Sequence, residues 1–180
     1  VTTQTPDLTA DSGVYYRDFN GEDTGAATSY SAGNLGGSAA LSVVTSGAYG
    51  GSGKSLEFSN AGTNISHSHV RDTAQELSSG DFTFTSLIKL SRTNDANACR
   101  GGVFFRGDTT SGYIAILRPQ ATSSTIRLAR VSGGTETVIS TVNYNASGTF
   151  EADVWYRMQV FAEGSTVKVR VWKDGDSEPS

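Results

Sequence analysis

The sequence places tryptophan and arginine side chains close together near its end. Aromatic rings can pack against the apolar face of a sugar ring, and guanidinium groups beside them can bind its charged or polar groups. Trp155, Arg157 and Trp172 form the centre of this set. Three more residues, on strands that we expect to be adjacent, complete the set: Arg106, Tyr113 and Arg127. Together the six residues predict a carbohydrate-binding surface suited to an acidic glycan.

A second set of residues has the oxygen-rich character that calcium uses. Asp18, Asn20 and Asp23 lie within six residues, although their spacing is not that of an EF-hand. Asp153 would approach this loop if the first and penultimate strands are neighbours. These four residues therefore predict a structural Ca²⁺ site.

The tryptophans and arginines lie on a predicted β-hairpin that turns at Gly164-Ser165. A two-residue turn pairs residue 160 with 169, 158 with 171 and 162 with 167, which makes one face wholly apolar. The opposite face then places Phe161 beside Lys168, Gln159 beside Arg170 and Arg157 beside Trp172. A competing interpretation is structural: the tryptophans pack under loops and Arg157 stacks on Trp172.

The remaining pattern is that of short strands joined by turns. Residues 81–90 alternate, with Phe82, Ile88 and Leu90 on one face. Residues 125–131 and 136–142 predict a second hairpin across Gly133-Gly134, with Leu128 facing Ile139. Further strands are expected at residues 14–19, 55–59, 65–70, 102–106 and 112–117. We expect residues 26–54 to form glycine-rich loops around one weak strand at residues 41–44, and residues 72–77 to form a helical turn.

Composition narrows the fold and the partners. About ten strands with regular turns predict an all-β fold, a two-sheet antiparallel sandwich or jelly roll. We expect a linker-like lead over residues 1–12 and a single domain over residues 13–180. The net charge of −4 disfavours nucleic acid as a partner, and no stretch approaches the roughly 20 apolar residues that span a bilayer.

Several motifs in the second half resemble the laminin-G-like modules of the concanavalin A-like lectin/glucanase superfamily. Residues 80–84 (GDFTF) match the strand that begins the strongest half of such modules. Residues 102–108 (GVFFRGD) with 111–116 (SGYIAI) are similar to their central hairpin, and 154–158 (VWYRM) with 167–175 (VKVRVWKDG) to their final pair. The resemblance implies a jelly roll, an extracellular or surface location and, in many members, a structural calcium. It also implies a further strand after Glu178-Pro179, so we expect either a domain that closes without it or a longer parent chain.

The superfamily also contains hydrolases and lyases. Its retaining glycosidases carry an E-x-D-x-x-E strand, whereas residues 151–156 (EADVWY) have no second glutamate. His67 and His69 alternate on one face of a short strand and could serve a lyase or a metal, but surface positions explain them more simply. Arg106-Gly107-Asp108 spells the integrin-type tripeptide at a framework hairpin. The sequence thus predicts no enzyme.

Three functions remain, in order of preference. The first is a non-catalytic extracellular module that binds a glycan or polysaccharide, or mediates adhesion. The second is a structural or decoration domain of a surface fibre, surface layer or virion, which contacts copies of itself or other modules. The third is a polysaccharide hydrolase or lyase.

Asn64 and Asn145 match the N-glycosylation pattern, and Cys99 is a lone thiol.

Overall fold

The computed structural model describes residues 25–26, 31–34, 40–51, 53–59, 68–71, 80–91, 100–108, 110–145 and 148–180. These residues form one short 3₁₀ helix, η1 (Tyr49–Gly51), and twelve strands. The strands are β1 (Gly25–Ala26), β2 (Ser31–Asn34), β3 (Ala40–Val44), β4 (Ser55–Ser59), β5 (Ser68–Arg71), β6 (Phe82–Lys89), β7 (Gly101–Phe105), β8 (Ser111–Arg118), β9 (Thr125–Ser132), β10 (Thr135–Asn143), β11 (Trp155–Glu163) and β12 (Thr166–Lys173). Within these ranges, no helix has the length and apolarity needed to cross a membrane.

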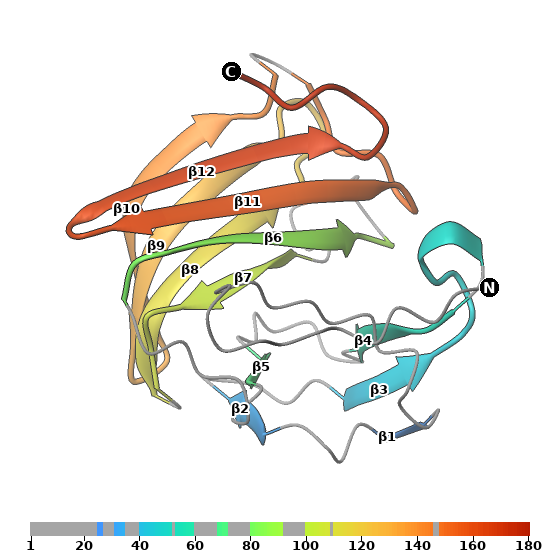
Figure 1. The fold of residues 1–180 in the computed structure, drawn as a ribbon, viewed down its shortest axis with the longest axis horizontal. Helices are drawn as coiled ribbons and strands as arrows, with labels where there is room; N and C mark the ends of the chain where they lie inside the picture. Colours follow the sequence, from blue (N-terminus) through green and yellow to red (C-terminus); the bar gives the residue numbers. More distant parts are fainter. Residues whose placement is uncertain are drawn as a thin grey trace, which may run out of the picture.

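The protein is an all-β antiparallel sandwich, which confirms the predicted fold class. Strands β10-β9-β8-β7 form one sheet and β12-β11-β6 form another, and the two cross one another in Figure 1. The core lies between them: Met158 and Val160 of β11 belong to the same buried cluster as Phe105 of β7 and Leu117 of β8. The N-terminal strands form two smaller sheets, β1-β3-β4 and β2-β5.

The register predicted for the last hairpin is confirmed. Glu163 pairs with Thr166 across the Gly164-Ser165 turn, and Val160 pairs with Val169. Gly164 has a φ of 53°, a backbone conformation that glycine adopts without strain. Burial alternates along β11, so one side of the hairpin faces the core and the other is partly exposed. The hairpin is anchored in the sheet by β6, because Trp155 pairs with Lys89 at one end and Ala162 with Phe82 at the other.

The second hairpin differs from the prediction at one position. Val138 pairs with Ala129 as expected, but the register then shifts and Leu128 pairs with Ser140 rather than Ile139. The prediction that Leu128 faces Ile139 is therefore wrong. Ile139 lies in a β-bulge, which adds one residue to β10 and leaves its side chain 54% exposed.

The N-terminal region contains two strands that the sequence did not predict. β1 and β2 consist of Gly, Ala, Ser and Asn, which carry no strand signal of their own, and they pair with β3 and β5. β5 is observed at Ser68–Arg71 rather than residues 65–70, of which residues 65–67 lie outside the described ranges. The expected strand at residues 14–19 and the helical turn at residues 72–77 also lie outside them.

Three aromatic rings close one end of the core. Phe150 lies 4.5 Å from Tyr144 and 5.0 Å from Tyr156, measured between ring centroids. The Tyr156 hydroxyl accepts a hydrogen bond from the Glu151 N–H at 2.9 Å, and the buried Ser124 hydroxyl accepts one from the Phe150 N–H at 3.0 Å. Burial raises the pKa of both tyrosines, so they stay neutral. This aromatic cluster fixes the chain that enters β11.

We expect Phe150→Ala to lower the free energy of unfolding by about 3–5 kcal/mol, because Phe150 is only 2% exposed and its removal leaves a cavity. Urea denaturation measures this change. Phe84→Ala is the matched control, since Phe84 is 37% exposed and its loss removes much less buried area. Equal effects of the two substitutions would contradict the assigned core.

Candidate functional site

The partly exposed side of the sheet β12-β11-β6, here called the outer face, carries aromatic and cationic side chains in rows. Each row follows from the pairing of β11 with its two neighbours. Arg157 lies between Leu87 and Trp172, and Gln159 lies between Thr85 and Arg170. Phe161 lies between Thr83 and Lys168 in the last row, where the Lys168 ammonium is 5.6 Å from the ring centroid. The alternation of strands alone therefore brings these groups onto one surface.

Trp155 and its neighbours form the most aromatic part of the outer face. The Lys89 ammonium lies 5.1 Å from the centroid of the Trp155 ring, and the Tyr49 ring meets it edge-on at 5.7 Å. Tyr49 belongs to the loop between β3 and β4 and is 42% exposed. The Lys89 ammonium also donates to the Gly47 carbonyl, which ties this loop to the sheet. One side of Trp155 is thus covered and the residue is half-buried, whereas Tyr49 beside it is exposed.

Arg157 is held in place by its own hydrogen bonds. Its Nε donates to Oδ1 of Asp174 at 2.6 Å, and its Nη2 donates to the Tyr49 hydroxyl at 3.4 Å. The bond to Asp174 is the main cause that raises the pKa of Arg157. The Arg157 side chain is 37% exposed, so it is accessible from solvent in a fixed position.

The outer face is more cationic than anionic within the described residues. Asp174 pairs with Arg157, and Glu178 pairs with Arg170 at 2.7 Å. Lys89 and Lys168 lie over aromatic rings and have no carboxylate partner in the described part of the chain. A chain whose net charge is −4 thus presents one surface with excess positive charge.

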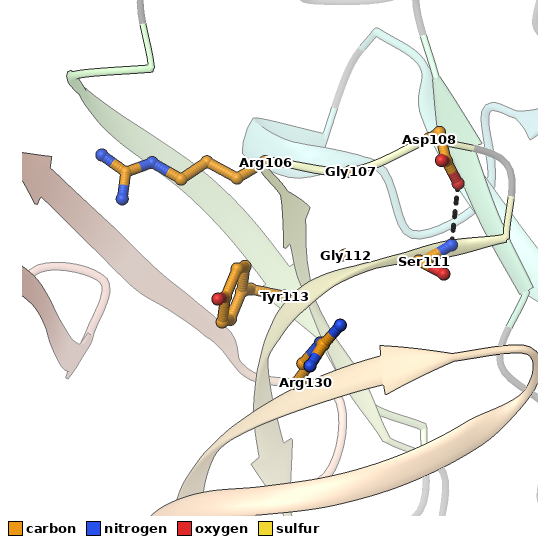
Figure 2. A pocket seen from close by; sticks show the side chains of 7 residues that line it. All are labelled: Arg106, Gly107, Asp108, Ser111, Gly112, Tyr113 and Arg130. Atoms are coloured by element: carbon orange, nitrogen blue, oxygen red, sulfur yellow. Dashed lines mark hydrogen bonds between the residues drawn. The ribbon is translucent and has the colours of Figure 1, made fainter. Parts of the chain in front are cut away.

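A separate hollow of about 490 Å³ lies at the other end of the sandwich (Figure 2). It is bounded by the turn between β7 and β8 and by the neighbouring part of β9. Its lining residues are Arg106, Gly107, Asp108, Ser111, Gly112, Tyr113 and Arg130. Tyr113 stacks on Phe105, with ring centroids 5.9 Å apart and planes at 22°.

Arg106 lines this hollow, but its guanidinium is committed to the fold. It donates to the Gly80 carbonyl at 2.7 Å, to the Gly164 carbonyl at 2.7 Å and to Oδ1 of Asp81 at 3.1 Å. Asp81 also accepts the Gly164 N–H at 2.8 Å. Arg106 thus joins the start of β6 to the turn between β11 and β12.

The Arg106-Gly107-Asp108 tripeptide has a structural explanation at both ends. Asp108 accepts bonds from the backbone N–H groups of Thr110 and Ser111, at 2.7 and 2.8 Å, which closes the turn between β7 and β8. The Asp108 carboxylate therefore stabilises its own turn, and the Arg106 guanidinium joins β6 to the turn between β11 and β12. This agrees with the framework interpretation of the tripeptide.

The six predicted carbohydrate-binding residues thus fall in three places. Trp155, Arg157 and Trp172 share the outer face, and Arg106 and Tyr113 share the hollow. Arg127 lies apart, on the four-stranded sheet, in an ion pair of 2.6 Å with Glu136 whose side chains are 17% and 13% exposed. The nearby Arg100 has its pKa lowered by burial first and then by repulsion from Arg118.

Most of the predicted metal and histidine residues lie outside the described ranges: Asp18, Asn20, Asp23 and His67. Asp153 is described, and its N–H donates to the Leu90 carbonyl at 2.8 Å in a turn with a φ of 60°. Among the residues that the structure describes, no three His, Cys, Asp or Glu side chains are grouped to hold a metal. Asn145 is exposed just after β10, whereas Asn64 and Cys99 lie outside the described residues.

Glu151, the first residue of the glycosidase-like segment, forms an ion pair with Lys173. The two oxygens of the carboxylate accept from the ammonium at 2.9 and 3.2 Å. This bond raises the pKa of Lys173. The pair connects the start of β11 to the end of β12.

Sequence reasoning missed several groups of both sites. Lys89 could have been placed by pairing its strand with the last hairpin, since it alternates onto the same side as Leu87. Tyr49 carries no such signal, because it lies in a glycine-rich loop and reaches the outer face only through tertiary contact. Arg130 was missed because it follows Ile126 and Leu128 on a face that the pattern assigns to the core.

The chain matches no protein-family model, and it has no significant match among curated proteins or solved structures.

We expect Arg106→Ala to lower the free energy of unfolding by about 1–3 kcal/mol, because it removes three hydrogen bonds that join the start of β6 to the turn between β11 and β12. Thermal unfolding measures the change. Arg130→Ala is the matched control, since Arg130 is an exposed arginine of the same hollow. A similar unfolding temperature for both variants would contradict the structural role of Arg106.

Proposed function

We propose that this protein is a non-catalytic, extracellular or surface-exposed module that binds carbohydrate, and that the outer face of β12-β11-β6 is its binding surface. The observation that supports this most directly is the arrangement of Arg157, Trp172 and Tyr49. An oriented guanidinium lies beside an aromatic residue on each side, on an open surface. Flat aromatic groups with planar polar groups around them suit a sugar, which has one apolar face and a rim of hydroxyls.

The charge of the outer face favours an acidic glycan. Arg170 and Lys168 extend the positive surface along β12 beyond Arg157, with side chains spaced two residues apart. A polysaccharide laid along the strands would meet alternating aromatic and cationic groups. Carboxylate or sulfate groups on it would compete with Asp174 and Glu178 for the two arginines.

The purely structural interpretation accounts for part of this surface. Trp155 is packed by Lys89 and Tyr49, and Arg157 is tied to Asp174, as that interpretation expects. It does not explain why the Tyr49 ring is exposed or why Lys168 and Arg170 lie on the same surface of β12. We therefore propose that Trp155 positions Tyr49, and that Tyr49, Arg157 and Trp172 contact the ligand.

We also propose a structural calcium ion, which both the oxygen-rich residues and the resemblance favour. The ion would be bound by Asp18, Asn20 and Asp23 of the oxygen-rich loop, with Asp153 from the turn before β11 as a further ligand. A hard cation with oxygen ligands would neutralise these carboxylates and fix the loop. Its role would be structural, as it is in the modules that the chain resembles.

On a glycan array, we expect the protein to bind acidic glycans, and Trp172→Ala and Arg157→Ala each to lower affinity by about tenfold or more. Phe84→Ala and Arg118→Ala are matched controls, because they remove an aromatic ring and a positive charge elsewhere. Loss of binding with added chelator would reveal the calcium requirement. Circular dichroism confirms that each variant is folded.

An array with no hits, or controls that lose as much affinity as the outer-face variants, would contradict carbohydrate binding there. Release of reducing or unsaturated ends from a polysaccharide panel would contradict the non-catalytic part of the proposal.

A second function, a structural or decoration domain of a surface fibre, surface layer or virion, is favoured by one observation. In the described part of the chain, β10 is the outermost strand of its sheet. Val138, Ile139 and Val142 on it are 48%, 54% and 54% exposed. Exposed apolar residues on an edge strand are suited to contact with another copy.

If this assembly forms, light scattering should show oligomers that grow with protein concentration, and Val138→Lys with Val142→Lys should return the protein to monomer. The two lysines place like charges on an otherwise apolar contact. A monomer at all concentrations would contradict the assembly function.

A further inference from the structure

The hollow at the end of the sandwich contains a cation where the alternation of β9 predicts an apolar residue. Ile126 and Leu128 of β9 pack against the core, and Arg130 is the next residue on that face. Arg130 is exposed and lines the hollow together with Tyr113 (Figure 2). It forms no hydrogen bond or ion pair with other residues in the described ranges. All its guanidinium donors are thus available to a ligand.

Tyr113 offers a flat surface beside this cation. The register places Phe105, Tyr113 and Arg130 next to one another on three adjacent strands. Phe105 stacks on Tyr113 from its own side. The side of Tyr113 toward Arg130 therefore borders the hollow, and an apolar ring face could pack there while a charged group reaches the guanidinium.

The part of the lining that Gly107 and Gly112 form is fixed by packing. The Phe104 ring lies against two glycines, so that a Cβ on either Gly107 or Gly112 would come within 2.5 Å of its Cζ atom. The turn is also held by the Asp108 bonds to Thr110 and Ser111. Arg106 contributes positive charge, but its donors are already used by the fold. The hollow is therefore a preformed space with one free anchor.

We propose that this hollow is a second binding site, for a single sugar residue that carries a negative charge as a carboxylate or a sulfate. Arg130 binds the anionic group through charge-assisted hydrogen bonds, and Tyr113 packs against the ring of the sugar. The hollow, of about 490 Å³, is open to solvent, so it has room for one sugar ring and leaves part of that ring exposed.

This site does not depend on the proposed function of the outer face. Arg106 connects the hollow to Gly164, at the end of β11 opposite to Trp155 and Arg157. A ligand can therefore bind at either place without the other. Variants in the two sites should have independent effects.

The test is an isothermal titration of the full chain with glucuronic acid, glucose 6-sulfate, glucose and inorganic sulfate. We expect at least one anionic sugar to bind, with glucose weaker by about tenfold or more. Comparison of the two anionic sugars identifies the source of the charge. Arg130→Ala and Tyr113→Ala should each lower the affinity about tenfold, whereas Tyr113→Phe keeps the ring and most of the affinity.

Arg118→Ala is the matched control, because it removes the same charge from the neighbouring strand β8 outside the hollow, and it should bind normally. Trp172→Ala should also bind normally, since it alters only the outer face. Failure of both anionic sugars to bind, or unchanged binding by Arg130→Ala, would overturn the proposal. The proposal would also be overturned if inorganic sulfate bound as tightly as the sugars and Tyr113→Ala left the affinity for sulfate and sugars unchanged.

Discussion

The burial of one face of β11 is the interaction on which the rest of the structure depends. Tyr156, Met158, Val160 and Ala162 are at most 1% exposed, and the first three belong to the core cluster between the two larger sheets. β11 is also the middle strand of its sheet, with β12 and β6 bonded on either side. Burying this apolar surface supplies the main favourable free energy of the sandwich.

The same constraint creates the outer face. Because successive side chains of a strand point to opposite sides, fixing four apolar residues inward places Trp155, Arg157, Gln159 and Phe161 outward. The backbone of the strand thus fixes the positions of these four residues, and no loop is needed to hold them. A surface built on a central strand is rigid, which limits the entropy lost when a ligand binds.

Charged groups of similar type have different roles in this protein, and their surroundings decide which. Arg106 has its donors bonded to backbone carbonyls and Asp81, so it acts as a connection within the fold. Arg127 is nearly buried with Glu136. Arg157 is oriented but accessible, and Arg130 is exposed without a partner in the described ranges. Residue type alone would have treated these four arginines as equivalent.

The sequence by itself determined the fold class, the register of the last hairpin and the residues of the outer face on β11 and β12, because a two-residue period and a short turn are local properties. The pairing of Leu128 was mispredicted, since a bulge depends on how the whole edge strand fits its neighbour. Only the tertiary structure decided that Tyr49 joins Trp155, that Arg106 is bound to Gly164 and that Arg130 opens into a hollow. Each of these depends on contacts between segments far apart in the chain, whose geometry is set by packing rather than by local pattern.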